Sequence, residues 1–166
     1  MKNMINYGGS FMQIVGKNSI GNFLKIFLQI CFYFGIILLV ILPFILKMLG
    51  FNMGASMFVI YPNGIILLLI TRNFIKLFDS LKNNTPFCIE NVRILKKTSV
   101  ISFVGALFWL IDLVYQVLFV NSKDIVFIVT LGFLSILFLG VAIALYILSE
   151  LFKQAYNYKE ENELTI

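Results

Sequence analysis

Asp112 is the only acidic residue deep within a long apolar stretch of this chain, and Gln116 follows it four residues later. On a helix, this spacing places the two side chains one turn apart on the same face. An ionised carboxyl group in hydrocarbon costs free energy, so it must be protonated, paired with another group or turned toward a water-filled cavity. The pair is therefore a candidate proton or cation site. The alternative is an acid that is simply hydrogen-bonded within a helix bundle.

The residue types needed for most other site chemistry are absent or scattered. The chain has no histidine, and its two cysteines, Cys31 and Cys88, lie in an apolar run and in a polar segment respectively. That separation predicts no disulfide, zinc site or haem site. No serine has a nearby base, and no glycine-rich phosphate loop occurs. We therefore expect no enzyme activity, no catalytic residues, no metal and no cofactor.

The composition identifies the elements that must position these residues as membrane helices. Hydrophobic residues make up 60% of the 166 residues, charged residues only 13%, and mean hydropathy is +0.96. Soluble domains are roughly half apolar and one quarter charged. Four apolar runs are long enough to cross a bilayer at about 20 residues each. We predict an all-α integral membrane four-helix bundle in contact with the lipid bilayer.

The predicted organisation has three parts. Residues 1–22 form a flexible or interfacial segment, residues 23–152 form the membrane domain, and residues 153–166 form an acidic cytoplasmic tail. The spans are expected at about 25–48, 62–81, 89–120 and 125–152. The start of the second span allows two interpretations, because Pro62-Asn63-Gly64 interrupts its apolar run. One is a kinked helix from Gly54; the favoured one is a short external element followed by a helix that opens at Pro62.

The polar segment from Arg72 to Lys97 is predicted to extend the second and third spans into a cytoplasmic helical hairpin. Apolar residues recur at helical spacing beyond Ile70, as Phe74, Leu77, Phe78 and Leu81. The run Asn83-Asn84-Thr85-Pro86 should end that helix, because proline disfavours helical geometry in the preceding residue. A new helix is expected to begin near Cys88 to Glu90, where Glu90 would suit the positive helix end.

The distribution of basic residues predicts the orientation. Eleven lysines and arginines fall on the side of the termini and the polar segment, whereas only Lys47 and Lys123 fall on the other side. Basic residues near span ends accumulate on the cytoplasmic face. We predict a multi-pass cell-membrane protein with both termini cytoplasmic. The net charge of +5 is assigned to contacts with anionic headgroups and not to direct nucleic-acid binding.

Small residues recur at close spacing on the third and fourth spans. Ser102 and Ala106 lie four residues apart on one, and Gly132, Gly140 and Ala144 form a stripe on the other. Small residues let membrane helices approach closely. We interpret both stripes as packing surfaces within the chain, in preference to a dimer interface.

Two segments of the chain resemble a family of small bacterial four-span membrane proteins that is defined as a domain of unknown function. These are Pro86-Phe87-Cys88-Ile89-Glu90-Asn91 and the ending Glu160-Glu161-Asn162-Glu163-Leu164-Thr165-Ile166. Cys88 departs from the Thr or Ser that is typical of the family's connector. The resemblance implies a small helix-turn-helix regulator as a cytosolic partner, because such a regulator is often encoded beside members of the family.

These observations lead to one main functional hypothesis and two alternatives. The main one is a non-enzymatic, regulatory membrane protein that docks a cytosolic partner through a surface made of Phe87, Glu90, Asn91, Glu163, Leu164, Thr165 and Ile166. The first alternative is an ion or proton channel or transporter component that uses Asp112 and Gln116 as an intramembrane polar site. The second is an accessory subunit that packs beside another membrane subunit, such as a larger transporter.

Overall fold

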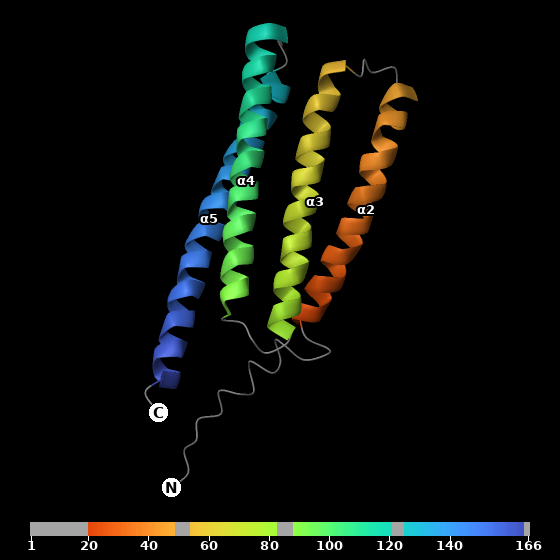
Figure 1. Cartoon of the computed structure of the whole chain (residues 1–166). Coiled ribbons are helices and arrows are strands. Elements are labelled where there is room, and N and C mark those ends of the chain that lie inside the picture. Colours follow the sequence, from red (N-terminus) through yellow and green to blue (C-terminus); the bar gives the residue numbers. More distant parts are fainter. Residues whose placement is uncertain (1–19, 49–53, 83–87, 121–124, 165–166) are drawn as a thin grey trace.

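The computed structural model describes residues 20–48, 54–82, 88–120 and 125–164, and within them it contains helices and no strand (Figure 1). The α-helices are α2 (Ile20–Met48), α3 (Gly54–Lys82), α4 (Ile89–Tyr115) and α5 (Ile125–Leu164). A π-helical segment, η1 (Gln116–Val120), continues α4. Three helices are long and apolar enough to cross a membrane, over 21–48, 89–118 and 125–162. The all-α prediction and its helical membrane bundle are confirmed.

The start of α3 corrects the favoured interpretation of the second span. The helix begins at Gly54 and contains Pro62, so it does not open at that proline. Proline removes one backbone donor, but membrane helices tolerate this where neighbouring groups compensate for the loss. Asn63 lies inside the helix and is buried. At Gly64, an added Cβ would lie 2.6 Å from Leu39 Cδ1 of α2. Within the segment that was expected to open the helix, Asn63 and Gly64 therefore serve helix packing.

Successive helices run antiparallel, and each packs chiefly against its neighbours in the chain (Figure 1). The most extensive packing is between α4 and α5. Gly105 of α4 shows how tightly the helices meet, because a Cβ there would lie 2.8 Å from Phe138 Cδ1 of α5 and 3.1 Å from Ile66 Cγ2 of α3. One face of α4 is thus enclosed by α3 and α5 together.

Two reciprocal hydrogen bonds fix the register between α4 and α5. The Ser99 hydroxyl donates to the Ala142 carbonyl at 2.8 Å, and the Ser135 hydroxyl donates to the Ala106 carbonyl at 3.1 Å. The contact positions are seven residues apart on each helix. A seven-residue repeat is the spacing of left-handed helix pairs, and small side chains let the two backbones come close.

The small-residue stripes are only partly used for packing within the chain. Ser102 and Ala106 are buried, and a Cβ at Gly132 would lie 3.3 Å from Leu113 Cδ1 of α4. Gly140 and Ala144 are exposed, and no atom lies within 4 Å of a Cβ added at Gly140. The interpretation was therefore right for the first three residues and wrong for Gly140 and Ala144, which are turned about 80° or more away from Gly132 by the helical repeat.

We expect Gly105→Ala to lower the free energy of unfolding by about 1–3 kcal/mol, because the methyl group would be pressed between a ring and a branched side chain. The matched control is Gly140→Ala, which adds the same methyl group to open space. It should leave stability unchanged or raise it by up to about 1 kcal/mol, since alanine is the better helix former. Thermal unfolding in detergent measures both; equal effects of the two substitutions would contradict the packing described for Gly105.

Candidate functional site

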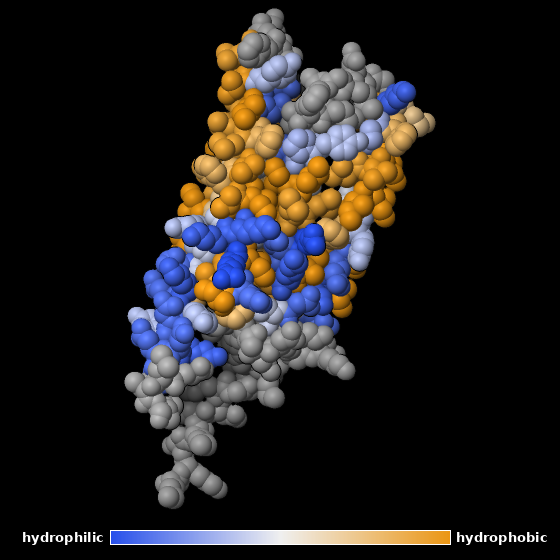
Figure 2. Space-filling model, viewed as in Figure 1, coloured by the Kyte–Doolittle hydropathy of each residue, from blue (hydrophilic) through white to orange (hydrophobic). Residues whose placement is uncertain are grey.

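The charged side chains gather at one end of the molecule, which we call the basic end. It comprises the start of α2, the end of α3, the start of α4 and the second half of α5. Figure 2 shows hydrophilic residues over the lower ends of α3, α4 and α5, with apolar residues above them. The basic side chains described there are Lys25, Arg72, Lys76, Arg93, Lys96, Lys97, Lys153 and Lys159.

The basic end is held together by contacts between helices. Lys25 near the start of α2 forms an ion pair with Asp79 near the end of α3. The Ser80 Oγ and Cys88 Sγ atoms lie 3.6 Å apart and join the end of α3 to the start of α4. Cys88 is the N-cap of α4 but makes no side-chain capping bond, so its thiol links two helices rather than ending one. Both cysteines are free thiols, as predicted.

The predicted docking residues divide into those that the structure places and those that it does not. Glu90 is exposed in the first turn of α4. Asn91 is fully buried, at 0% exposure, so its side chain belongs to the bundle interior and not to a docking surface. The remaining residues lie outside the described part of the chain or, within α5, have side chains that are not described: Phe87, Glu163, Leu164, Thr165 and Ile166.

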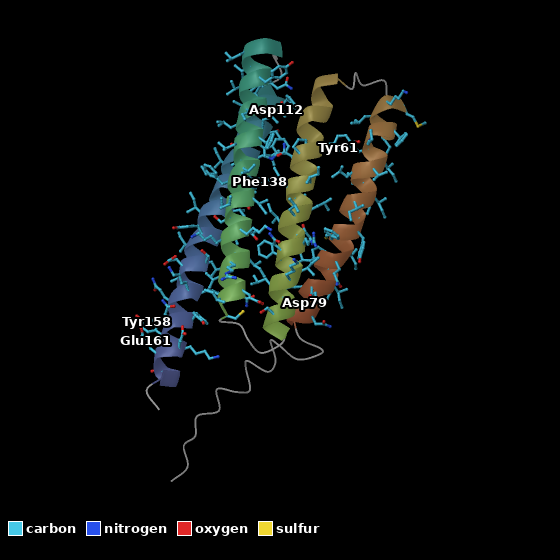
Figure 3. All side chains as sticks on the ribbon, in the orientation of Figure 1. Tyr61, Asp79, Asp112, Phe138, Tyr158 and Glu161 are labelled. Atoms are coloured by element: carbon cyan, nitrogen blue, oxygen red, sulfur yellow. The ribbon has the colours of Figure 1, made fainter. Side chains whose placement is uncertain are left out.

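The carboxyl-terminal turns of α5 project beyond the start of α4. The Ser99–Ala142 bond and the antiparallel register place Ser149 opposite Val92, which is three residues after the start of α4. Residues from Lys153 to Leu164 therefore continue for about 18 Å past α4. Tyr158, with 66% exposure, and Glu161 lie on this extension (Figure 3). Residues 153–164 of the expected acidic tail are thus the last part of a 40-residue helix, and residues 165–166 lie outside the described part of the chain.

The intramembrane polar site lies near the opposite end of α4, as Figure 3 shows for Asp112. Asp112 is 5% exposed, and the Gln116 side chain is hydrogen-bonded to its carboxyl group. The pairing matches the spacing of four residues in the sequence. The Asp112 Oδ1 atom has no hydrogen-bond partner within the described residues. The backbone N–H of Gln116 reaches the carbonyls of both Asp112 and Leu113, where α4 passes into the π-helical segment.

Two more polar atoms on the same face of α4 are buried without a partner among the described residues. They are Ser102 Oγ, in a residue with 0% exposure, and Trp109 Nε1. Ser102 and Trp109 lie about one helical turn on either side of Gly105, so they share the face that α3 and α5 enclose. Buried polar groups nearly always have a partner, in the protein or in ordered water.

Asn63 adds a polar group from α3 at this level. It is 5% exposed and precedes Ile66, which meets Gly105, by about one helical turn. Because α3 and α4 are antiparallel, Asn63 lies on the side of Gly105 toward Trp109 and Asp112. The sequence analysis missed this residue because it treated Pro62-Asn63-Gly64 as an interruption of the apolar run, at which the helix opens. It also missed Ser99 and Ser135, for which the seven-residue spacing of Ser99–Ala106 and Ser135–Ala142 was the available signal.

Comparison with known proteins identifies the family. The model of a family described as "Protein of unknown function (DUF2975)" matches residues 17–166. The chain belongs to the DUF2975 family. This confirms the resemblance to a domain-of-unknown-function family, and the match includes every helix described above. No curated protein and no solved structure matches the chain. Among the described residues, no group of three or more His, Cys, Asp or Glu could hold a metal ion.

We expect Asp112→Leu to raise the free energy of unfolding by about 1–3 kcal/mol, because it removes a buried carboxyl oxygen, Asp112 Oδ1, that has no partner among the described residues. Gln116→Leu is the matched control, since it leaves the carboxyl group in place and removes its hydrogen bond; it should lower stability. Thermal unfolding in detergent measures both variants. A loss of stability in Asp112→Leu would show instead that the carboxyl group is needed for the packing of α4.

Proposed function

We propose that this protein is a four-span protein of the cell membrane whose basic end faces the cytoplasm and docks a cytosolic partner. Both termini would then be cytoplasmic, and the role would be regulatory and non-enzymatic. The observation that carries the proposal is the set of exposed basic side chains on the hairpin formed by α3 and α4. These are Arg72, Lys76, Arg93, Lys96 and Lys97.

The position of these charges supports the orientation. The basic end contains eight of the described lysines and arginines, whereas Lys47, at the end of α2, lies at the opposite end. This asymmetry agrees with the accumulation of basic residues on the cytoplasmic side of membrane proteins. Four spans, with α3 as the second, would return the chain to the side on which it starts.

The surface of the basic end supports docking. Two ion pairs of the described residues are Lys25–Asp79 and Lys153–Glu150, and neither involves the five hairpin cations. Glu90 is the exposed acid on the first turn of α4, and the extension of α5 beyond α4 adds Tyr158, Glu160 and Glu161. A partner could contact basic and acidic elements at once, which gives both attraction and a defined orientation.

The basic and acidic side chains of the basic end suit a partner protein whose surface carries both charges. The family resemblance suggests which class of protein this partner belongs to. A small helix-turn-helix regulator is the partner that we propose. Binding at the membrane would hold such a regulator away from DNA. Anionic lipid headgroups compete for the same cations, so the experiment must separate protein docking from lipid contact.

Pull-down of the full chain from detergent, with the partner's DNA-binding domain identified by mass spectrometry, tests this proposal. We expect Lys96→Glu with Lys97→Glu to reduce recovery of the partner at least about tenfold, because charge reversal at a docking surface costs several kcal/mol. Deletion of residues 164–166 should also reduce recovery. The control is Lys47→Glu, which changes the same charge at the opposite end and should leave recovery unchanged.

Two outcomes would contradict the proposal. One is that no DNA-binding protein is recovered with the unmodified chain. The other is that the Lys47→Glu control loses as much partner as the Lys96→Glu and Lys97→Glu variant, which would mean that total charge and not the hairpin surface governs recovery. Repeating the pull-down in detergent free of anionic lipid separates the two kinds of contact, because only direct contact with the protein can then retain the partner.

A further inference from the structure

The helices α3 and α4 carry two surface stripes of the same composition. In each stripe, cations toward the basic end are continued by apolar side chains toward the middle of the helix. The stripe on α3 is Lys76, Arg72, Leu69 and Ile65. The stripe on α4 is Arg93, Lys97, Ile101 and Val104. Successive members are three or four residues apart, so each stripe lies on one face of its helix.

Both stripes lie on the same side of the helix pair, which we call the seam. Ile66 of α3 faces Gly105 of α4, because a Cβ at Gly105 would lie 3.1 Å from Ile66 Cγ2. Lys76 is rotated from Ile66 by about 80°, and Lys97 is rotated from Gly105 by about 80° in the same sense. Antiparallel helices are related by a two-fold axis, so equal rotations turn both lysines to one side. Figure 2 shows this side, where a hydrophilic band crosses α4 and α3 beneath apolar residues.

The cations of the two stripes also lie at nearly the same height. The antiparallel register is set by the contact of Ile66 with Gly105, and the apolar cluster shared by α3 and α4 agrees with it. This register places Lys97 between Arg72 and Lys76, about 3 Å from each along the helix axis. Packed helices are about 8–10 Å apart, and Lys and Arg side chains are long. Cations from both helices can therefore converge on one group at the seam.

The acidic side chains near the seam lie at its outer edge. All four cations of the stripes are exposed, and the ion pairs described above at the basic end include none of them. Asp79 of α3 belongs to the ion pair with α2. Glu90 lies about one turn beyond Arg93, away from the apolar residues. Arg72 and Lys97, which border the apolar residues, therefore have positive charge to share with an anion.

An anionic phospholipid fits the seam in both charge and polarity. Its phosphate oxygens accept hydrogen bonds from ammonium and guanidinium groups, and such charge-assisted bonds are strong. Basic groups between membrane helices bind lipid phosphates in this way. The acyl chains of the same molecule would lie along the apolar half of the stripes. A free phosphate would leave that apolar half without a role, so the two halves together select a lipid.

We propose that the seam binds an anionic phospholipid, with its phosphate between Arg72 and Lys97 and its acyl chains along Leu69 and Ile101. The site goes beyond partner docking, because it needs no cytosolic protein. It also divides the hairpin cations by face. Lys96 is exposed but lies about 100° around α4 from Lys97, so it is not part of the seam. Lys96 therefore stays available to a partner while the lipid is bound.

Native mass spectrometry of the full chain in neutral detergent tests the site. We expect one molecule of phosphatidylglycerol to be retained per chain and phosphatidylcholine to be lost under the same conditions. Lys97→Gln and Arg72→Gln should each weaken phosphatidylglycerol binding about fivefold, the effect of one cation near an anionic headgroup. Lys96→Gln is the matched control, because it removes the same charge from the neighbouring residue; its effect should stay below about twofold.

Three results would overturn the site. The first is an equal loss in Lys96→Gln and Lys97→Gln, which would mean that the total charge of the hairpin attracts the lipid. The second is equal retention of phosphatidylcholine, and the third is unchanged binding in Arg72→Gln, since cations of both helices must then not share the phosphate. Circular dichroism of each variant shows that its helices are intact, which these exposed positions lead us to expect.

Two competitors distinguish a lipid from a free anion. Inorganic phosphate and glycerophosphoglycerol, which is the same headgroup without acyl chains, should not displace the retained phosphatidylglycerol. Displacement by either one would overturn the assignment, because the apolar half of the seam would then contribute nothing. These measurements use no partner protein, so their failure leaves the docking proposal standing, and a failed pull-down leaves the lipid site standing.

Discussion

Lipid chains are as apolar as leucine side chains, so burial of apolar surface does not by itself bring membrane helices together. Association then depends on close packing and on hydrogen bonds between helices. In this protein both are concentrated between α4 and α5, where small residues meet and two serine hydroxyls reach carbonyls of the facing helix. The rest of the arrangement follows from this pair, because its register sets which face of α4 turns toward α3.

The same constraint explains why the interior is unusually polar. Large apolar side chains are plentiful on the outside, where lipid accommodates them, and the enclosed positions of α4 are largely small or polar. A hydroxyl such as that of Ser99 contributes packing and a hydrogen bond at once. Where a buried polar atom has no partner among the described residues, as at Ser102 Oγ, its desolvation costs free energy.

The sequence was sufficient for the helices and for the distribution of charge, because both depend on composition along the chain. It was sufficient for the Asp112–Gln116 pair too, since a spacing of four residues on one helix needs no partner helix. The sequence was insufficient where contact with a facing helix determines which residues are buried. Asn91 suits a helix start and is nevertheless buried, and Gly140 resembles Gly132 but faces outward.

Proline and glycine caused the error in the predicted start of the second span. Pro62 and Gly64 are typical of a turn in soluble proteins, whereas here Gly64 allows Leu39 of α2 to approach the α3 backbone. The π-helical turn at Gln116–Val120 has no signature in the sequence that we can identify. It adjoins Asp112, and such turns occur frequently at functional sites, so the feature of greatest interest near the carboxyl group is one that only the structure supplies.

The register of α4 against α5 is the most direct point at which to test this account. Cysteines placed at Ser99 and Ala142, with Cys31 and Cys88 replaced by serine, should form a disulfide within one chain when native membranes are oxidised, because the hydroxyl and carbonyl at these positions are 2.8 Å apart. A pair at Ser99 and Leu139, which is displaced by three residues, should not. Crosslinking of the displaced pair, or crosslinks that form only between chains, would contradict the packing on which the enclosed face of α4 depends.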